Sequence, residues 1–127
     1  MKGLTCIFIF TLAVISCQDS KQEVKRLLER GQKEDLVKAF YLIGENRDTS
    51  FLKEVIANPY DPRIVHLAQF YGMSVYQSKM VALRKISGLS PPRKITYQPD
   101  STVVNFYCRW INRNTSVQCD EKSAKMH

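Results

Sequence analysis

The 127-residue sequence lacks the long apolar run, the charge blocks and the low-complexity tracts on which many functional assignments depend. Its longest apolar segment, Leu4 to Ile15, has about a dozen residues, whereas a membrane-spanning helix needs roughly 20. No block of five or more like charges occurs. Apolar and charged residues are present in the proportions of an ordinary globular protein, so the chain suffices for one domain with a modest core.

Catalytic sequence patterns are also missing. The sequence contains no glycine-rich phosphate loop, no Gly-x-Ser-x-Gly, no His-Glu-x-x-His and no acidic residues at metal-loop spacing. Its two histidines are His66 and His127, and a single histidine beside Val65 is far more often a packing or surface residue than a base. We therefore expect a non-catalytic protein without a metal or other cofactor.

The formal net charge of +7 raises the question of an anionic partner. Lysine and arginine residues are scattered along the chain, which favours a solvated helical surface, while a footprint for an acidic partner or for anionic headgroups stays open. Nucleic acid is not an expected partner, because the N-terminus indicates export from the cytoplasm.

The N-terminus is typical of an export signal. Lys2 precedes the apolar segment, and the composition becomes polar from Gln18 onward. We expect residues 1–16 to be a signal peptide, so that the mature chain begins at Cys17.

The junction Val14-Ile15-Ser16-Cys17 resembles a bacterial lipobox. This resemblance implies that Cys17 is acylated by palmitate-type chains in a lipoprotein, and two or more acyl chains anchor a protein stably where one does not. Because Gln18 rather than aspartate follows the cysteine, it implies the outer membrane in a Gram-negative cell. The alternatives are a plain signal peptide, which would give a secreted or periplasmic protein, and an uncleaved anchor.

Two further cysteines remain in the mature chain, Cys108 and Cys119. In an oxidising compartment this even pair predicts a disulfide, which would close a loop of about a dozen residues and stabilise the fold by roughly 3 kcal/mol. Free thiols stay open as an alternative. A metal or redox pair is disfavoured, because metal sites need closer spacing and more ligands.

Apolar residues recur at helical spacing and predict an all-α domain over residues 23–111, between a lipidated tether at 17–22 and a polar tail at 112–127. The expected helices cover residues 21–30, 33–43, 49–57, 62–71, 74–87 and 100–111. The expected helix ends are Gly31, Gly44, Gly72 and Gly88, and the expected caps include Asp61 with Pro62, Ser74, and Asp100 or Ser101. A short strand at Val103 to Tyr107 is the main alternative for the last element.

Two stretches resemble HEAT-like helical repeats. Asp61 to Ala68 resembles the turn and first helix of such a repeat, and Ala82 to Gly88, followed by Tyr97, Asp100 and Trp110, resembles the end of many bacterial HEAT-like domains. The resemblance implies short antiparallel helix pairs stacked as a repeat. HEAT-like repeats are mostly binding scaffolds, so the resemblance implies partner binding without naming the partner.

These observations predict a lipid-anchored, non-catalytic protein-interaction module of the bacterial cell envelope. Its expected partner is an unknown protein, and its candidate partner-binding residues are Tyr60, Tyr71 and Tyr76. The alternative is a membrane-anchored immunity or inhibitor protein that acts against a secreted toxin or hydrolase.

Overall fold

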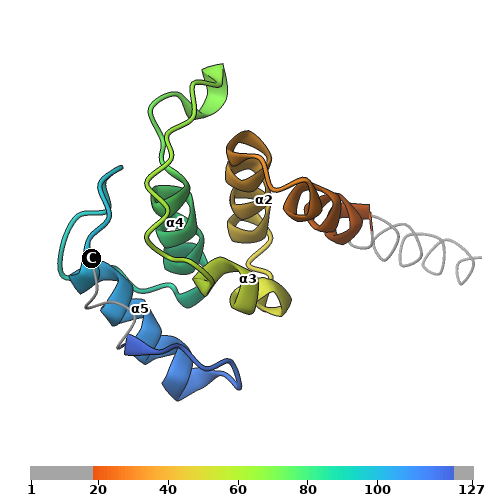
Figure 1. The fold of residues 1–127 in the computed structure, drawn as a ribbon. Helices are drawn as coiled ribbons and strands as arrows, with labels where there is room; N and C mark the ends of the chain where they lie inside the picture. The colour runs from red at the N-terminus through yellow and green to blue at the C-terminus, as the bar shows by residue number, and fades with distance from the viewer. Residues whose placement is uncertain (1–18, 122–127) are drawn as a thin grey trace, which may run out of the picture.

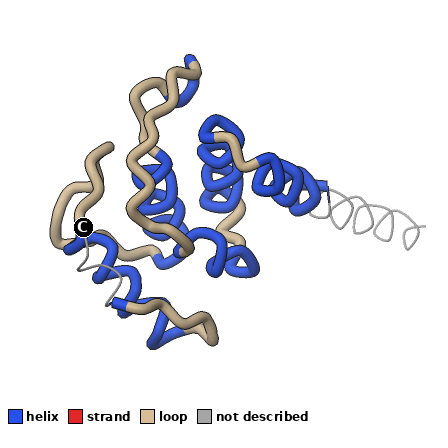
Figure 2. The backbone as a smooth tube through the Cα atoms, in the orientation of Figure 1, coloured by secondary structure: helices blue, strands red, loops and turns tan. Residues whose placement is uncertain are grey.

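A computed structural model of the chain describes residues 19–121, so the expected signal peptide at 1–16 and the expected lipidation site Cys17 lie outside the described residues. The first described helix covers residues 19–30. The elements after it are α2 (Lys33–Glu45), the 3₁₀ helix η1 (Thr49–Phe51), α3 (Leu52–Ile56), the 3₁₀ helix η2 (Ala68–Phe70), α4 (Val75–Ser87) and α5 (Ser101–Asn114). Figure 2 shows helices joined by two long loops, with no strand in the described part of the chain. No helix within residues 19–121 has the length and apolar character needed to cross a membrane.

The packing of α2 against α4 forms the centre of the fold, and the two helices lie side by side in Figure 1. They run in the same direction, because Phe40 lies beside Lys79 and, further along both helices, Glu45 pairs with Lys85. The core between the helices and around them is fully closed to solvent at positions such as Val37 and Leu83. The predicted all-α class with packed helix pairs is confirmed.

Gly44 is the last residue but one of α2, which continues to Glu45, and its φ is not positive, so it does not terminate the helix as predicted. A Cβ atom on Gly44 would lie 3.0 Å from the Cα atom of Ala82, which is closer than side-chain packing normally allows. The glycine therefore serves the close approach of two helices. A glycine selected for packing looks the same in a sequence as one selected to end a helix.

The capping residues predicted for α4 and α5 are confirmed. The side chains of Ser74 and Asp100 each accept a hydrogen bond from a backbone N–H group in the first turn that follows. Gly88 ends α4 in the left-handed conformation, with φ of +71°, which glycine adopts without steric cost. Because α5 is a regular helix through Asn114, the alternative strand at Val103 to Tyr107 is excluded.

The helix predicted over residues 62–71 does not form, and Asp61 with Pro62 does not begin one. Residues 61–76 instead form a hairpin, in which the Tyr76 N–H donates to the Asp61 carbonyl at 2.8 Å and the Val65 N–H donates to the Met73 carbonyl at 3.0 Å. The turn of this hairpin carries η2 and lies beyond the start of α4 at the top of Figure 1. The first of the two stretches that resemble a HEAT-like repeat is therefore not helical.

Both ends of the described chain are held against the domain. Residues 19–22, expected to be a tether, belong to the helix 19–30, and the Asn46 side chain donates to Ser20 Oγ at 2.7 Å. Val24 and Leu27 of this helix are buried in the core. At the other end α5 continues to Asn114, past the expected start of the tail at residue 112.

A disulfide joins Cys108 in α5 to Cys119 in the segment 115–121 that follows, with their Cα atoms 5.3 Å apart. Asn112 reinforces this closure through its side-chain amide. Its Nδ2 donates to the Cys119 carbonyl at 2.9 Å, and its Oδ1 accepts from the Cys119 N–H at 2.8 Å. The predicted connection between the last helix and the C-terminal segment is therefore present in the structure.

Candidate functional site

The three candidate partner-binding tyrosines lie in three different environments. Tyr76 is fully buried in the core, and burial raises the pKa of its hydroxyl to about 12. Tyr60 is half-buried, and burial followed by the charge of Asp100 raises the pKa of its hydroxyl. Tyr71 is 76% exposed at the turn of the hairpin. Of the three candidate residues, only Tyr71 is exposed, so the three side chains do not form one exposed face.

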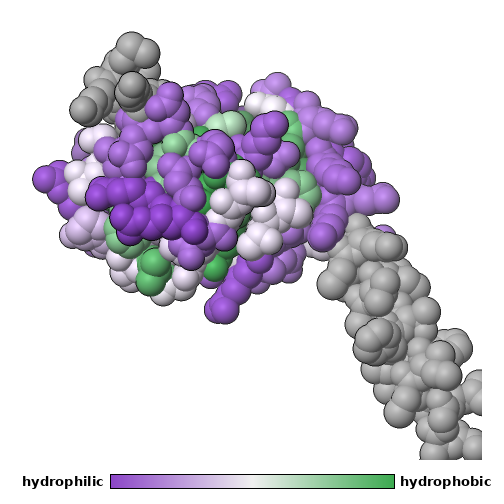
Figure 3. All heavy atoms as spheres, turned by 90° about the horizontal axis from the view of Figure 1, so that it is seen from below, coloured by the Kyte–Doolittle hydropathy of each residue, from purple (hydrophilic) through white to green (hydrophobic). Residues whose placement is uncertain are grey.

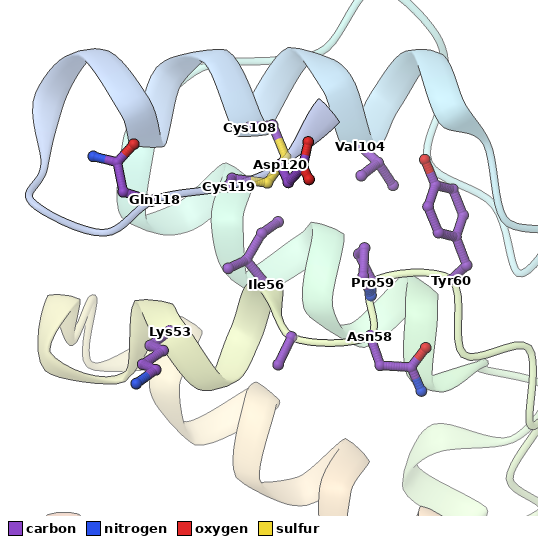
Figure 4. A pocket seen from close by; sticks show the side chains of 11 residues that line it. Lys53, Ile56, Asn58, Pro59, Tyr60, Val104, Cys108, Gln118, Cys119 and Asp120 are labelled. Carbon is purple, nitrogen blue, oxygen red and sulfur yellow. A yellow bond between two sulfur atoms is a disulfide. The ribbon is translucent and has the colours of Figure 1, made fainter. Parts of the chain in front are cut away.

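Tyr60 lines a cleft between the end of α3 and α5, which we call the disulfide cleft. In Figure 4, Ile56 and Val104 point into this cleft beside the Cys108–Cys119 bond, whereas Lys53 points away from it. The lining is mainly apolar, and its charged and amide side chains come from two places, Lys53 and Asn58 on one side and Gln118 and Asp120 on the other. The cleft is thus a gap in the packing between two elements, without a converging set of polar groups.

A network of charged residues fixes the base of the hairpin. Arg63 Nη2 donates to Asp61 Oδ2 at 2.7 Å, and Arg63 Nε donates to Asp61 Oδ1 at 3.0 Å. Burial alone would raise the pKa of Asp61, but hydrogen bonds from the side chain and backbone of Arg63 outweigh this effect and lower it. The bidentate geometry positions the Arg63 side chain at the start of the hairpin.

Lys79 is the buried cation next to this pair. It is 4% exposed, and its Nζ donates to the carbonyl oxygens of Ala57 and Asn58 at the end of α3 while lying 5.0 Å from the centroid of the Phe40 ring. Burial lowers the pKa of Lys79 to about 8, against the opposing effect of Asp61. Because both carbonyls belong to the main chain, the contacts of Lys79 join α3 to α4 and do not form a reactive site.

A second cleft, of about 430 Å³, lies between the turn of the hairpin and the proline-rich loop at residues 89–99. We call it the tyrosine cleft, since Tyr71 and Tyr97 line it and are 76% and 50% exposed. The rest of the lining comes from residues 69–73, Gln77 and residues 94–97. No other large apolar or aromatic side chain within residues 19–121 is more exposed than these two tyrosines.

The hairpin turn that carries Tyr71 is held in place by aromatic contacts. Phe70 is buried, and its ring centroid lies 5.3 Å from that of Tyr41 on α2. His66 is exposed, and its ring lies 5.6 Å from that of Tyr71. Tyr71 is therefore an exposed aromatic side chain on a backbone that is fixed to the core, which is a favourable arrangement for binding.

The acidic residues of the chain are distributed unevenly, although the basic residues are scattered along it. Residues 62–99 contain six lysines or arginines and no acidic residue. Residues 19–61 contain eight basic and nine acidic residues, and residues 100–121 contain two basic and three acidic ones. The net positive charge of the described chain therefore comes from the segment that contains the hairpin, α4 and the proline-rich loop. Both walls of the tyrosine cleft belong to this segment.

Other candidate sites are weaker. No group of three or more His, Cys, Asp or Glu side chains within residues 19–121 is placed to hold a metal ion. Trp110 is partly buried and packs against the core. On the face seen in Figure 3, hydrophilic side chains surround smaller apolar areas.

Comparison with known proteins gives no match: no family model, no curated protein and no solved structure is significantly similar to this chain.

Sequence reasoning missed the two residues that complete the tyrosine cleft, Lys94 and Tyr97. The signal that could have found them is the absence of acids from residues 62–99, a segment that contains six basic residues. A search for runs of basic residues does not detect it.

Proposed function

We propose that the protein is a lipid-anchored, non-catalytic protein-interaction module of the bacterial cell envelope, and that its tyrosine cleft is the partner-binding site. The observation that carries the proposal is the pair of exposed tyrosines, Tyr71 and Tyr97, on the walls of one cleft. Exposed aromatic side chains on a fixed backbone contribute much of the affinity at protein interfaces, because they bury a large area with little loss of conformational entropy.

The anchor is proposed from the lipobox-like sequence at Cys17, and the structure adds a geometric consequence. Because a helix packed on the domain is present from residue 19 onward, an acylated Cys17 would be two residues from the folded domain. The module would then be held close to the membrane surface, where its partners would be other proteins of the envelope.

The anchor is tested by mass spectrometry of the detergent-extracted protein, with Cys17→Ala as the comparison. An acylated N-terminal Cys17 in the wild type, absent from the variant, supports it. An unmodified chain that fractionates with soluble proteins in both cases rejects the anchor and leaves the cleft to be tested in solution.

The cleft is tested by photo-crosslinking in living cells. A photoreactive phenylalanine analogue replaces Tyr71 or Tyr97 and, as controls, the exposed Arg26 and Asn114. The proposal expects one discrete crosslinked protein species at the two cleft positions and not at the controls. Equal crosslinking at all four positions, or none at the cleft, rejects the cleft as the binding site.

A further inference from the structure

We infer that the tyrosine cleft binds an acidic, extended peptide segment of a partner protein, in which carboxylates flank an aromatic or aliphatic side chain. This inference rests on the proposed function and specifies the chemistry of the partner. It follows from the charges near the cleft, from the side chains that line it, and from which of the nearby cations already form an ion pair.

The cations of residues 62–99 differ in whether a carboxylate already neutralises them. Arg63 pairs with Asp61, Lys85 with Glu45, and Arg93 lies 3.6 Å from Asp100. Lys79 is buried against main-chain carbonyls.

Lys94 and Arg84 take part in none of the ion pairs within residues 19–121. Of these two, Lys94 lines the tyrosine cleft and is exposed. The cleft therefore has an available positive charge, and its lining contains no acidic residue that would oppose an anionic ligand.

The remaining lining favours a peptide over other anions. Tyr71 and Tyr97 offer aromatic surface for an apolar side chain, and the amides of Gln69 and Gln77 can donate to and accept from a peptide backbone. A surface for phosphate groups would instead be expected to gather several arginines or lysines. A single available cation beside two aromatic side chains matches a segment with both carboxylates and apolar side chains.

The long-range field acts in the same direction. Lys94 and Arg84, the two exposed cations of residues 62–99 that have no ion pair within residues 19–121, would attract an acidic segment before contact and accelerate association. Because exposed charges are screened by salt, the inferred interaction weakens as ionic strength rises.

The test uses the detergent-solubilised full chain and three ten-residue peptides of equal length and equal Leu and Phe content. Their flanking positions carry aspartate and glutamate, asparagine and glutamine, or lysine. Binding is followed by NMR shifts of the backbone amides at residues 69–73 and 94–97. We expect the acidic peptide to bind about tenfold or more tightly than the neutral one, the basic peptide not to bind, and only acidic binding to weaken between low and high salt.

Variants locate the site. Tyr71→Ala and Tyr97→Ala should each weaken binding of the acidic peptide by about tenfold, as for aromatic residues at the centre of an interface. Lys94→Gln should weaken it by about three- to fivefold, the effect of one exposed ion pair. Lys25→Gln, which removes an exposed charge from the helix 19–30, is the matched control and should leave binding unchanged.

Two results overturn the inference. The first is equal binding of the acidic and neutral peptides, or equal effects of Lys94→Gln and Lys25→Gln. The second is a protein that binds vesicles of phosphatidylglycerol but not the acidic peptide, with vesicle binding that requires Tyr71, Tyr97 and Lys94. This result would assign the cleft to anionic lipid. If position-specific crosslinking in cells succeeds while charge discrimination fails, the interaction module stands and only the acidic partner is rejected. If both fail, the proposed function fails as well.

Discussion

Among the lysines of the described chain, Lys79 has the environment least like that of a lysine in water. Its ammonium group is removed from water and held by two main-chain carbonyls, and burial lowers its pKa from 10.5 to about 8. A base whose pKa is lowered on folding binds its proton less tightly in the folded state. The unfolded chain therefore holds more protons than the folded chain between about pH 8 and pH 10.5, so the free energy of unfolding rises with pH in this window.

We predict that the wild-type protein gains stability relative to Lys79→Met as the pH rises from 7.5 to 9.5. The expected gain is about 2 kcal/mol, since each pKa unit corresponds to about 1.4 kcal/mol. Guanidinium unfolding of both proteins at several pH values measures the difference. The range stops below pH 10 because tyrosine ionisation would add a second effect above it. Burial raises the pKa values of Tyr76 and Tyr107 to about 12, so the folded protein loses stability once the same tyrosines ionise in the unfolded chain.

Lys53→Met is the control for this experiment, since Lys53 is exposed on α3. It should show the same dependence on pH as the wild type. A constant difference between wild type and Lys79→Met across the window would show that the buried lysine does not change its proton affinity on folding.

Gly44 gives a second prediction at the scale of one residue. Gly44→Ala should destabilise the protein by about 1–3 kcal/mol, because a methyl group in this contact must push α4 away from α2. The intrinsic preference of alanine for helices favours the opposite result by about 1 kcal/mol, so the sign of the change decides between packing and propensity. Thermal or chemical unfolding measures it. Lys38→Ala, at an exposed position of the same helix, should change stability by less than about 0.5 kcal/mol.

At the scale of elements, the sequence predicts a helix boundary correctly where contacts within a few residues determine that boundary. Ser74, Gly88 and Asp100 act through hydrogen bonds or φ angles within a few residues, and the helix boundaries that they predict are confirmed. The hairpin at residues 61–76 is decided by distant pairs, such as the Tyr76 N–H with the Asp61 carbonyl. An aspartate-proline pair predicts a helix start equally well, because the competing contacts lie more than a dozen residues away.

The disulfide is the element-scale feature with the most direct test. Cys119→Ser should lower the free energy of unfolding by up to about 3 kcal/mol, the loop-closure contribution of a bridge that spans about a dozen residues. It should also speed tryptic cleavage after the exposed Arg113, because the following segment loses its covalent connection. Asn112→Ala keeps the bridge while removing two hydrogen bonds, so it should change the cleavage rate much less. Equal cleavage rates in the two variants would mean that the hydrogen bonds of Asn112, and not the disulfide, hold residues 115–121 in place.

At the scale of the whole molecule, two features matter for function: where the charge lies and how the domain begins. The scattered basic residues drew attention away from the acidic ones, which are absent from residues 62–99. Lys94 and Tyr97 follow two prolines in a loop without helical periodicity, so no local pattern predicts that they face Tyr71. Their proximity depends on the packing of the hairpin and of the loop against α4, which only the three-dimensional structure supplies.

The start of the domain gives the last prediction. Val24 and Leu27 are 2% and 8% exposed, so the helix 19–30 contributes to the core and does not act as a spacer. A chain that begins at residue 19 should unfold with the same free energy as the full protein, whereas a chain that begins at residue 33 should lose about 4 kcal/mol, given roughly 1.5–3 kcal/mol for each buried aliphatic side chain. Chemical unfolding of the two chains measures this loss. Equal stability would mean that the helix is a separate segment between the proposed anchor and the domain, and the tyrosine cleft could then move freely relative to the membrane. A large loss would mean that an anchor at Cys17 restricts the distance between the membrane and the whole domain, including the cleft.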